Sequence, residues 1–327
     1  MMRGIGDLSP TLLALMSAQG GVFSSADARA HGHTDAEVQR LRTAKVLHAV
    51  RRGVYTWTAG WAEASPGQRH LMGISALRFG LSAPAVLSHD SAALVHGLAQ
   101  LRPRLDTLHV SRSFSSGTRI EAGVHHYVAE LPLDDVVRSE GAMAVTSRAR
   151  TAIDIAREST RLECAVAAID SALRSGVTRD DLEAVVMRCR SWRGARMAGR
   201  ALALADGRAA NPGESWSRVV LIQQGVAPTG LQVPVYDEDG LVGFADFGWD
   251  DVLGELDGKG KYGIGVDSDP EEAARIVWRE KRREDRLRAL GNDVVRWTYA
   301  DHRRPQVIAA RVIAAQARAP ERRRWSG

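Results

Sequence analysis

The chain has 327 residues, of which 44% are hydrophobic and 25% are charged, and its formal net charge at pH 7 is +5. These values exclude a disordered or fibrous chain and predict a globular protein of two or three domains. The basic balance allows a polyanionic partner. Cys164 and Cys189 are too few for a disulfide framework or a thiolate zinc site, so we expect a reducing, cytoplasmic location. No apolar run approaches the ~18 residues that span a bilayer, so we expect no membrane partner.

Three short helices are predicted at the start of the chain. Apolar residues at helical spacing predict the first helix over residues 8–20. Ser24 is followed three positions later by Asp27, and Thr34 is followed in the same way by Glu37. Such pairs form capping boxes, because each side chain accepts a backbone N–H that the helix leaves unpaired. They predict that the second and third helices begin after Ser24 and Thr34.

A β-hairpin is predicted over residues 47–57, around the sequence Arg51-Arg52-Gly53. Three short helices and a basic hairpin within residues 1–58 resemble a winged helix-turn-helix. The resemblance implies that the third helix enters the major groove of DNA and that the hairpin contacts phosphate. The residues predicted to contact DNA here are Arg40, Arg42, Lys45, Arg51 and Arg52. Two alternatives remain open: the arginines form a solvated face, or the module docks a protein.

The middle part, residues 59–160, is predicted to be an α+β domain. Its helices are predicted over residues 68–79, from Ser88, and after Thr146 or Ser147, and its strands over residues 107–110 and 123–127. The consecutive residues Ser88-His89-Asp90-Ser91 do not predict a hydrolase, because a catalytic triad converges from separate loops. We interpret them as a helix cap with a hydrogen-bonded histidine.

Four motifs of this part occur in a distinctive order: LSHDSAALVHGL, LDTLHVSR, GVHHYVAELPLDDV and VTSRARTAIDIA. With the N-terminal helices and hairpin they resemble the AbiEi-type antitoxin family, over residues 8–157. In that family the winged helix binds operator DNA, and the middle domain supports repression or neutralises a toxin. The resemblance implies a transcriptional regulator of a type IV toxin–antitoxin system, with DNA and a cognate nucleotidyltransferase-type toxin as partners.

A helical connector is predicted over residues 161–210. Gly176 separates its first two helices, and Thr178 caps the second with Asp181 three positions on. Arginines then follow at intervals that suit one exposed helical face: Arg188, Arg190, Arg193, Arg196 and Arg200. A solvated surface is the default interpretation of these arginines, and a stripe that faces phosphate is the alternative.

The last part, residues 211–327, concentrates carboxylates in an otherwise basic chain. Glu214 begins a helix, and Asp246 falls inside a strand, where a carboxylate needs a partner. Glu255 and Asp257 are two residues apart in the next strand and therefore point to one face. The strands are predicted over residues 231–236, 241–249, 252–259 and 293–299. With a basic helix over residues 271–290, the predicted order is helix–strand–strand–strand–helix–strand.

This order, with the pieces ADFGW, GELDGKGKYG and DRLRALGNDVVRWTYAD, resembles the PD-(D/E)XK nuclease superfamily, especially the branch similar to very-short-patch-repair endonucleases. The resemblance implies an α/β restriction-endonuclease-like domain, with a mixed sheet flanked by helices. It implies that Asp246 and Glu255 hold Mg²⁺ or Mn²⁺ for phosphodiester hydrolysis. Arg286 and Arg296 match basic positions of the family, and with Arg282 they are predicted to contact nucleic acid.

One residue departs from the superfamily pattern, because Asp257 stands where the pattern has lysine. Lys259 and Lys261 are the candidates for the missing base. The predicted catalytic set is Glu214, Asp246, Glu255, Asp257, Lys259 and Lys261. The leading hypothesis is a Mg²⁺-dependent DNA endonuclease that the winged helix recruits to DNA. The alternative is a non-catalytic, antitoxin-like regulator that carries an inactive nuclease fold. The sequence leaves the oligomeric state open.

Overall fold

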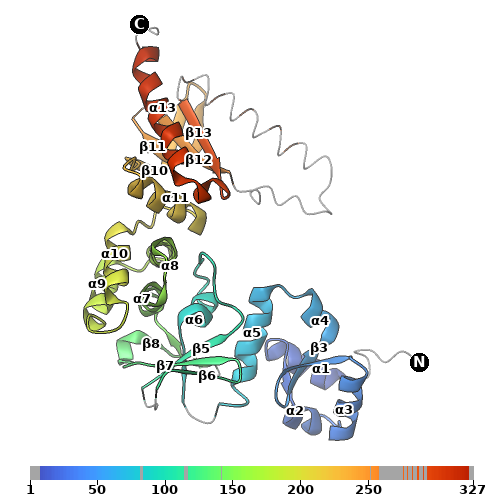
Figure 1. Cartoon of the computed structure of the whole chain (residues 1–327). Helices are drawn as coiled ribbons and strands as arrows, with labels where there is room; N and C mark the ends of the chain where they lie inside the picture. Colours follow the sequence, from blue (N-terminus) through green and yellow to red (C-terminus); the bar gives the residue numbers. More distant parts are fainter. Residues whose placement is uncertain are drawn as a thin grey trace. The chain divides into compact units, whose positions relative to one another are not determined.

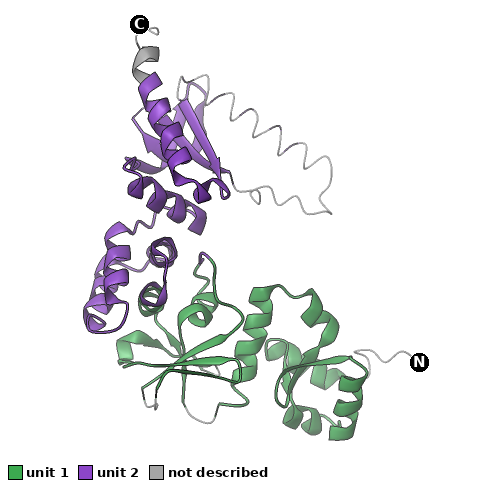
Figure 2. Cartoon of the chain, in the orientation of Figure 1, with its two compact units in different colours: residues 1–98, 102–155 green, residues 99–101, 156–327 purple. Residues whose placement is uncertain are grey.

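A computed structural model describes residues 8–81, 84–113, 117–140, 142–250, 252–257 and 293–323, together with Arg275, Trp278, Arg282, Arg286 and Leu290. The chain forms two compact units (Figure 2). Unit 1 comprises residues 1–98 and 102–155, and unit 2 comprises residues 99–101 and 156–327. The fold is mixed α and β, and the described strands form three separate sheets.

Unit 1 begins with three helices and a three-stranded sheet (Figure 1). The helices are α1 (Pro10–Ala18), α2 (Ser25–Ala30) and α3 (Asp35–Thr43), and the sheet order is β1 (Phe23–Ser24), β3 (Val54–Trp57), β2 (Leu47–Arg51). The capping boxes of Ser24 and Thr34 are both present, as predicted. Gly53 lies between β2 and β3 with a φ of +72°, which glycine adopts without steric cost. The predicted helices and hairpin of this part are therefore confirmed.

The rest of unit 1 is a six-stranded mixed sheet with helices. The sheet order is β6 (Arg119–Glu121), β7 (Val124–Val128), β5 (Leu108–Arg112), β4 (Val86–Leu87), β9 (Val145–Thr146), β8 (Val136–Val137). The helices are α4 (Thr58–Glu63), α5 (Pro66–Leu77), α6 (His89–Val95) and the start of α7 (Arg148–Glu158). The β5–β7 and β4–β9 pairs are parallel, and the other pairs are antiparallel. Ile74 and Leu77 of α5 pack against Leu108 and Val110 of β5.

Unit 2 combines a helical layer with a four-stranded sheet. The helices are α8 (Leu162–Arg174), α9 (Arg179–Arg188), α10 (Ala195–Leu204), α11 (Pro212–Gln223) and α13 (Pro305–Arg323). The sheet order is β10 (Gly230–Asp237), β11 (Gly240–Trp249), β12 (Val252–Asp257), β13 (Asp293–Thr298). The first three strands run antiparallel, and β12 and β13 run parallel. The sheet is therefore mixed, as predicted.

The arginine-rich C-terminal tail forms a helix that packs on the sheet of unit 2. α13 contacts β12 and β13. Its Ile308 and Val312 are fully buried with Val220 and Leu221 of α11 and Trp297 of β13. The apolar residues of this helix occur at helical spacing, but they lie within an arginine-rich sequence. The buried face of the helix was therefore not predicted from the sequence. Most of the basic helix predicted over residues 271–290 lies outside the described residues.

Candidate functional site

The outer surface of α3 carries the basic residues predicted to contact DNA. Val38 and Leu41 face the core, Arg40 and Arg42 are exposed on the two flanks of that buried face, and Lys45 is exposed two residues after the helix ends. Arg40 lies 3.8 Å from Glu37, a surface ion pair of little strength. Arg42 donates to the Gln39 side chain at 2.9 Å and lies 5.7 Å from the Tyr55 ring.

The two hairpin arginines have different environments. Arg52 is exposed, as the wing prediction requires. Arg51 is half-buried and donates from Nη1 to the carbonyl oxygen of Ala122, next to β7. Burial lowers the pKa of Arg51. Arg51 is thus held against the middle of unit 1, which the sequence did not predict, and a contact with DNA stays a prediction for both residues.

Two of the predicted acids, Glu214 and Asp246, are brought together by Gln232. Its Nε2 atom donates to Glu214 Oε2 at 2.9 Å and to Asp246 Oδ1 at 3.4 Å. Gln232 itself has a φ of +48°, which is uncommon for a residue with a side chain. The backbone N–H of Leu256 donates to Asp246 Oδ2 at 2.9 Å. The carboxylate predicted inside a strand therefore has amide partners.

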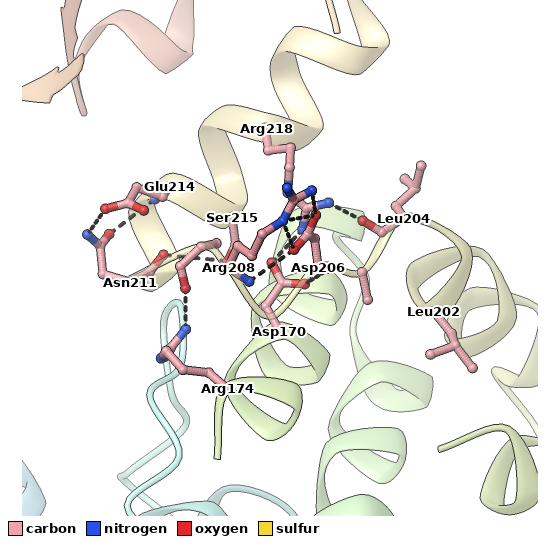
Figure 3. Close-up of polar contacts among 12 residues, drawn as sticks. Asp170, Arg174, Leu202, Leu204, Asp206, Arg208, Asn211, Glu214, Ser215 and Arg218 are labelled. Carbon is pink, nitrogen blue, oxygen red and sulfur yellow. Dashed lines mark hydrogen bonds and ion pairs between the residues drawn. The ribbon is translucent and has the colours of Figure 1, made fainter. Parts of the chain in front are cut away.

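Glu214 also stabilises the N-terminal end of α11. Its carboxylate accepts from the backbone N–H of Ala210 at 2.7 Å and from the side-chain amide of Asn211 at 2.6 Å. Asn211 in turn caps α11 by accepting the N–H groups of Gly213 and Glu214. These contacts give Glu214 a structural role at the loop that enters the last domain (Figure 3).

Glu255 pairs with Arg296 across the parallel strands. The two are register partners, and the Arg296 guanidinium lies 2.9 Å from Glu255 Oε2. Leu256, the next residue of β12, packs toward α11 and α13, so Glu255 lies on the other face of the sheet. Asp257 is exposed at the end of β12. Lys259 and Lys261 lie outside the described residues.

Whether a divalent cation can bind in this domain depends on Glu214, Asp246 and Glu255. In the described part of the chain, no three His, Cys, Asp or Glu side chains are grouped so that they could hold a metal ion. Glu214 and Glu255 use their carboxylates on amide and guanidinium donors. The described residues thus do not form a metal site by themselves, and Mg²⁺ or Mn²⁺ at Asp246 and Glu255 stays a prediction.

The predicted basic residues after β12 take different partners. Arg286 forms a two-bonded ion pair with Asp237 at the end of β10, with both N–O distances at 2.5 Å. This pair lowers the pKa of Asp237 and raises the pKa of Arg286. Arg282 is exposed, and its guanidinium lies 4.8 Å from the Trp278 ring. Arg296 and Arg286 are therefore engaged with carboxylates, and their proposed contact with nucleic acid stays a prediction.

A buried ion pair joins the helical layer of unit 2 to α11 (Figure 3). Arg218 of α11 donates from Nη2 to Asp170 Oδ2 of α8 at 2.5 Å, and both side chains are at least 94% buried. Asp170 also accepts the N–H of Asp206 at 2.7 Å, and Arg218 donates to the carbonyl oxygen of Leu204. Burial raises the pKa of Asp170, against the opposing effect of Arg218. The pair was absent from the sequence predictions.

A second buried polar cluster lies in unit 1, around Ser88-His89-Asp90-Ser91. These residues open α6, but Ser88 makes no side-chain cap, and all four side chains are buried. The Ser91 hydroxyl accepts from the backbone N–H of His109 at 2.8 Å and bonds His70 Nε2 at 2.7 Å, while Asp90 pairs with Arg104 at 2.8 Å. The helix-cap interpretation is therefore wrong for the Ser88 side chain, although His89 does bond Ser88 at 3.0 Å.

Comparisons with known proteins bear on part of the chain. A family model described as the AbiEi antitoxin C-terminal domain matches residues 83–206. The match begins before β4 and continues through α8, α9 and α10. It supports the AbiEi-type part of the sequence interpretation. The nuclease resemblance was predicted for residues 211–327, outside this match, and is not confirmed.

Two relatives come from Mycobacterium tuberculosis: "Uncharacterized protein MT2308" of strain CDC 1551 / Oshkosh and "Uncharacterized protein Rv2248" of strain ATCC 25618 / H37Rv. Each is 34% identical over 192 residues, or 58% of this chain. The chain covers 66% of each relative's length, just under two thirds. The crystal structure of the RV2827C protein from Mycobacterium tuberculosis is similar with a TM-score of 0.40 and 15% identity, over 66% of this chain and 82% of that chain.

Within the described residues, no helix combines the length and the apolar character needed to cross a bilayer.

Proposed function

We propose that the protein is an antitoxin-like transcriptional regulator that binds DNA through a winged helix-turn-helix at its N-terminus. The observation that carries this proposal is the AbiEi antitoxin family match over residues 83–206. The three helices and basic hairpin that precede the match support a DNA-binding role. The acids of unit 2 are engaged with amide and guanidinium groups, which favours this function over nuclease activity.

The recognition element of the proposed regulator is α3. Its apolar residues hold it on the core, so its other side is free to enter the major groove. Arg42 and Lys45 have no carboxylate within 4.0 Å among the described residues, and their charges are available to base edges and phosphates. Arg52 on the hairpin would contact an adjacent phosphate.

Replacing Arg40 and Arg42 together with glutamine is expected to weaken binding to the protein's own upstream duplex by roughly tenfold to a hundredfold. The physical reason is the loss of two exposed cations from α3. Fluorescence anisotropy with a labelled duplex, at two salt concentrations, measures the affinity. The slope of affinity against salt should also become shallower, because fewer phosphate-bound counterions are released.

The matched control is Arg303→Gln with Arg304→Gln, two exposed arginines of unit 2. It should bind DNA as the parent does. The proposal is wrong if the parent shows no duplex binding at low salt. It is also wrong if the α3 variant binds as tightly as the control.

A toxin partner is part of the proposal, because the family match is to an antitoxin domain. We expect a nucleotidyltransferase-type toxin encoded next to this chain. Co-expression should show that the full chain relieves the growth arrest that this toxin causes. If growth stays arrested although the full chain is expressed and folded, the antitoxin part of the proposal fails.

Metal-dependent nuclease activity is the second candidate function. The observation that favours it is the positive φ of Gln232, which places its amide between Glu214 and Asp246. Such uncommon backbone conformations concentrate at functional sites. Under the first function, we expect no nicking of supercoiled plasmid by the parent in Mg²⁺ or Mn²⁺. Nicking that disappears in both Asp246→Asn and Glu255→Gln would instead establish the nuclease.

A further inference from the structure

A cavity of about 710 Å³ lies inside unit 1. The hairpin β2–β3 forms one wall, α4 and α5 form another, and the segments around residues 105 and 122 complete it. Its volume is that of a pocket for a small organic ligand. The family match begins at residue 83, so it does not include the hairpin and helix that form most of this cavity.

Three arginines belong to the cavity lining: Arg51 and Arg69, which are partly buried, and Arg52, which is exposed. Within the described part of the chain, Arg69 donates only to carbonyl oxygens, those of Trp61 and Ala62, both at 2.8 Å. Arg51 likewise donates to a carbonyl oxygen at 3.2 Å. Among the residues that the structure describes, no carboxylate lies within 4.0 Å of these three guanidiniums. A cation taken partly out of water without a counter-charge costs stability, and a bound anion would offset that cost.

One acid in the lining offsets only one of the three positive charges. Asp106 is the one carboxylate among the lining residues, and it is exposed. Burial lowers the pKa of Arg51, which has no carboxylate within 4.0 Å among the described residues. The cavity thus keeps a net positive lining.

Apart from His70 and Asp106, the remaining lining residues are apolar side chains or glycines. Val54 and Leu108 are buried, and the Trp61 ring is fixed by stacking on His48, with ring centroids 4.5 Å apart. A ligand that fits must therefore carry an apolar part as well as negative charge. A phosphate monoester carries about −1.5 to −2 charges at pH 7 and three acceptor oxygens, which suits several guanidiniums at once.

We propose that this cavity binds a small phosphate-bearing molecule. Its phosphate lies among Arg51, Arg52 and Arg69, and its apolar part lies against Val54, Trp61 and Leu108. Two of the three cations belong to the hairpin, so the ligand would contact the element that is also proposed to meet DNA. The backbone of duplex DNA offers the same phosphate chemistry, and the experiment separates the two sources.

Calorimetric titration of the full chain with AMP, adenosine and inorganic pyrophosphate tests the site. AMP and pyrophosphate are expected to bind saturably, and adenosine at least about tenfold more weakly than AMP, because it lacks the charge. Arg69→Gln and Arg52→Gln should each weaken AMP binding by about tenfold. Thermal melting of each variant confirms that it is folded.

Gly80→Phe fills the cavity without removing a hydrogen bond. Gly80 lines the cavity and is exposed, and a Cβ added there meets no atom within 4 Å. This variant should abolish AMP binding. Gly199→Phe in α10, where an added Cβ also meets nothing, is the matched control and should bind AMP normally.

Three results would overturn the proposal. One is the absence of saturable AMP and pyrophosphate binding at about 1 mM. Another is AMP binding that Gly80→Phe leaves unchanged. The third is a loss of duplex binding in Arg52→Gln and Arg69→Gln without any AMP binding by the parent, which assigns the arginines to DNA. The DNA-binding function is judged separately, by the variants on α3.

Discussion

Replacing Arg218 with methionine is expected to lower the free energy of unfolding of unit 2 by roughly 3–5 kcal/mol. The substitution keeps most of the side-chain volume but leaves Asp170, which is fully buried, without its counter-ion. It also removes the donor to the Leu204 carbonyl oxygen. Because this pair ties α11 to α8, the loss should loosen the start of the last domain. Urea unfolding followed by tryptophan fluorescence measures the change.

The double variant Asp170→Asn with Arg218→Met is the informative control. Removing the charge that the single variant leaves unpaired should recover more than half of the lost stability. Arg200→Met, at an exposed position of α10, should change stability by less than about 0.5 kcal/mol. A single variant that loses less than about 1 kcal/mol would show that water reaches the pair and that it contributes little.

The effect of Arg218→Met should also depend on pH. The pKa of Asp170 is already raised by burial, and losing Arg218 raises it further. A carboxyl whose folded pKa exceeds its unfolded value is penalised while it is charged, and the penalty fades as pH falls through the folded pKa. The difference between variant and parent should therefore be smaller at pH 5 than at pH 8. An equal difference at both pH values would argue against an unpaired Asp170.

The sequence predicted the structural features whose stabilising contacts join residues close together in the chain. The capping boxes at Ser24 and Thr34 join residues three positions apart, and the turn at Gly53 needs only one flexible residue. Thr178 also caps α9 as predicted, with Asp181. These features depend on residues a few positions apart, so short sequence patterns are enough to predict them.

The pairing of buried polar groups could not be predicted in this way. Asp170 and Arg218 are 48 positions apart, and only the packing of α8 on α11 brings them together. Arg51 and Arg52 are adjacent in sequence, yet Arg51 turns toward Ala122 and Arg52 stays exposed. Glu214 and Asp246 do lie near each other, as their predicted roles require, but amide donors occupy them. The order of acidic residues in the sequence does not predict which hydrogen-bond donors pair with them in the fold.

The partners of the buried histidines of unit 1 could likewise not be predicted from the sequence. These contacts have a measurable consequence for how the stability of unit 1 depends on pH. His109 donates from Nε2 to the Arg104 carbonyl oxygen at 3.1 Å and accepts at Nδ1 from the Tyr127 hydroxyl at 3.1 Å. His70 donates from Nδ1 to the Leu105 carbonyl oxygen and accepts at Nε2 from Ser91. Each ring thus has one donor and one acceptor, so the network fits neutral imidazoles. Burial lowers the pKa of His70, and it lowers the pKa of His109 to about 4 although Asp90 opposes it.

Unit 1 is therefore expected to lose stability as pH falls from 6.5 toward 4. The folded pKa of His109 lies below its unfolded value, so the unfolded chain binds more protons in this window and gains stability relative to the fold. Above pH 6.5 both states are neutral at this residue, and its contribution is constant. At 1.36 kcal/mol per pH unit, His109 alone accounts for roughly 2 kcal/mol between pH 6.5 and pH 5.

Hydrogen exchange of the β5 and β7 amides, corrected for the intrinsic rate at each pH, measures this loss within unit 1. His109→Gln keeps a donor for the Arg104 carbonyl oxygen but cannot titrate, so its stability should fall less than that of the parent between pH 7 and pH 5. His31→Gln, at the C-terminal end of α2, should leave the parent's pH dependence unchanged. If His109→Gln and the parent lose the same stability over this range, His109 is protonated in the fold without cost. The neutral network of His109, Ser91 and His70 would then not stabilise the domain.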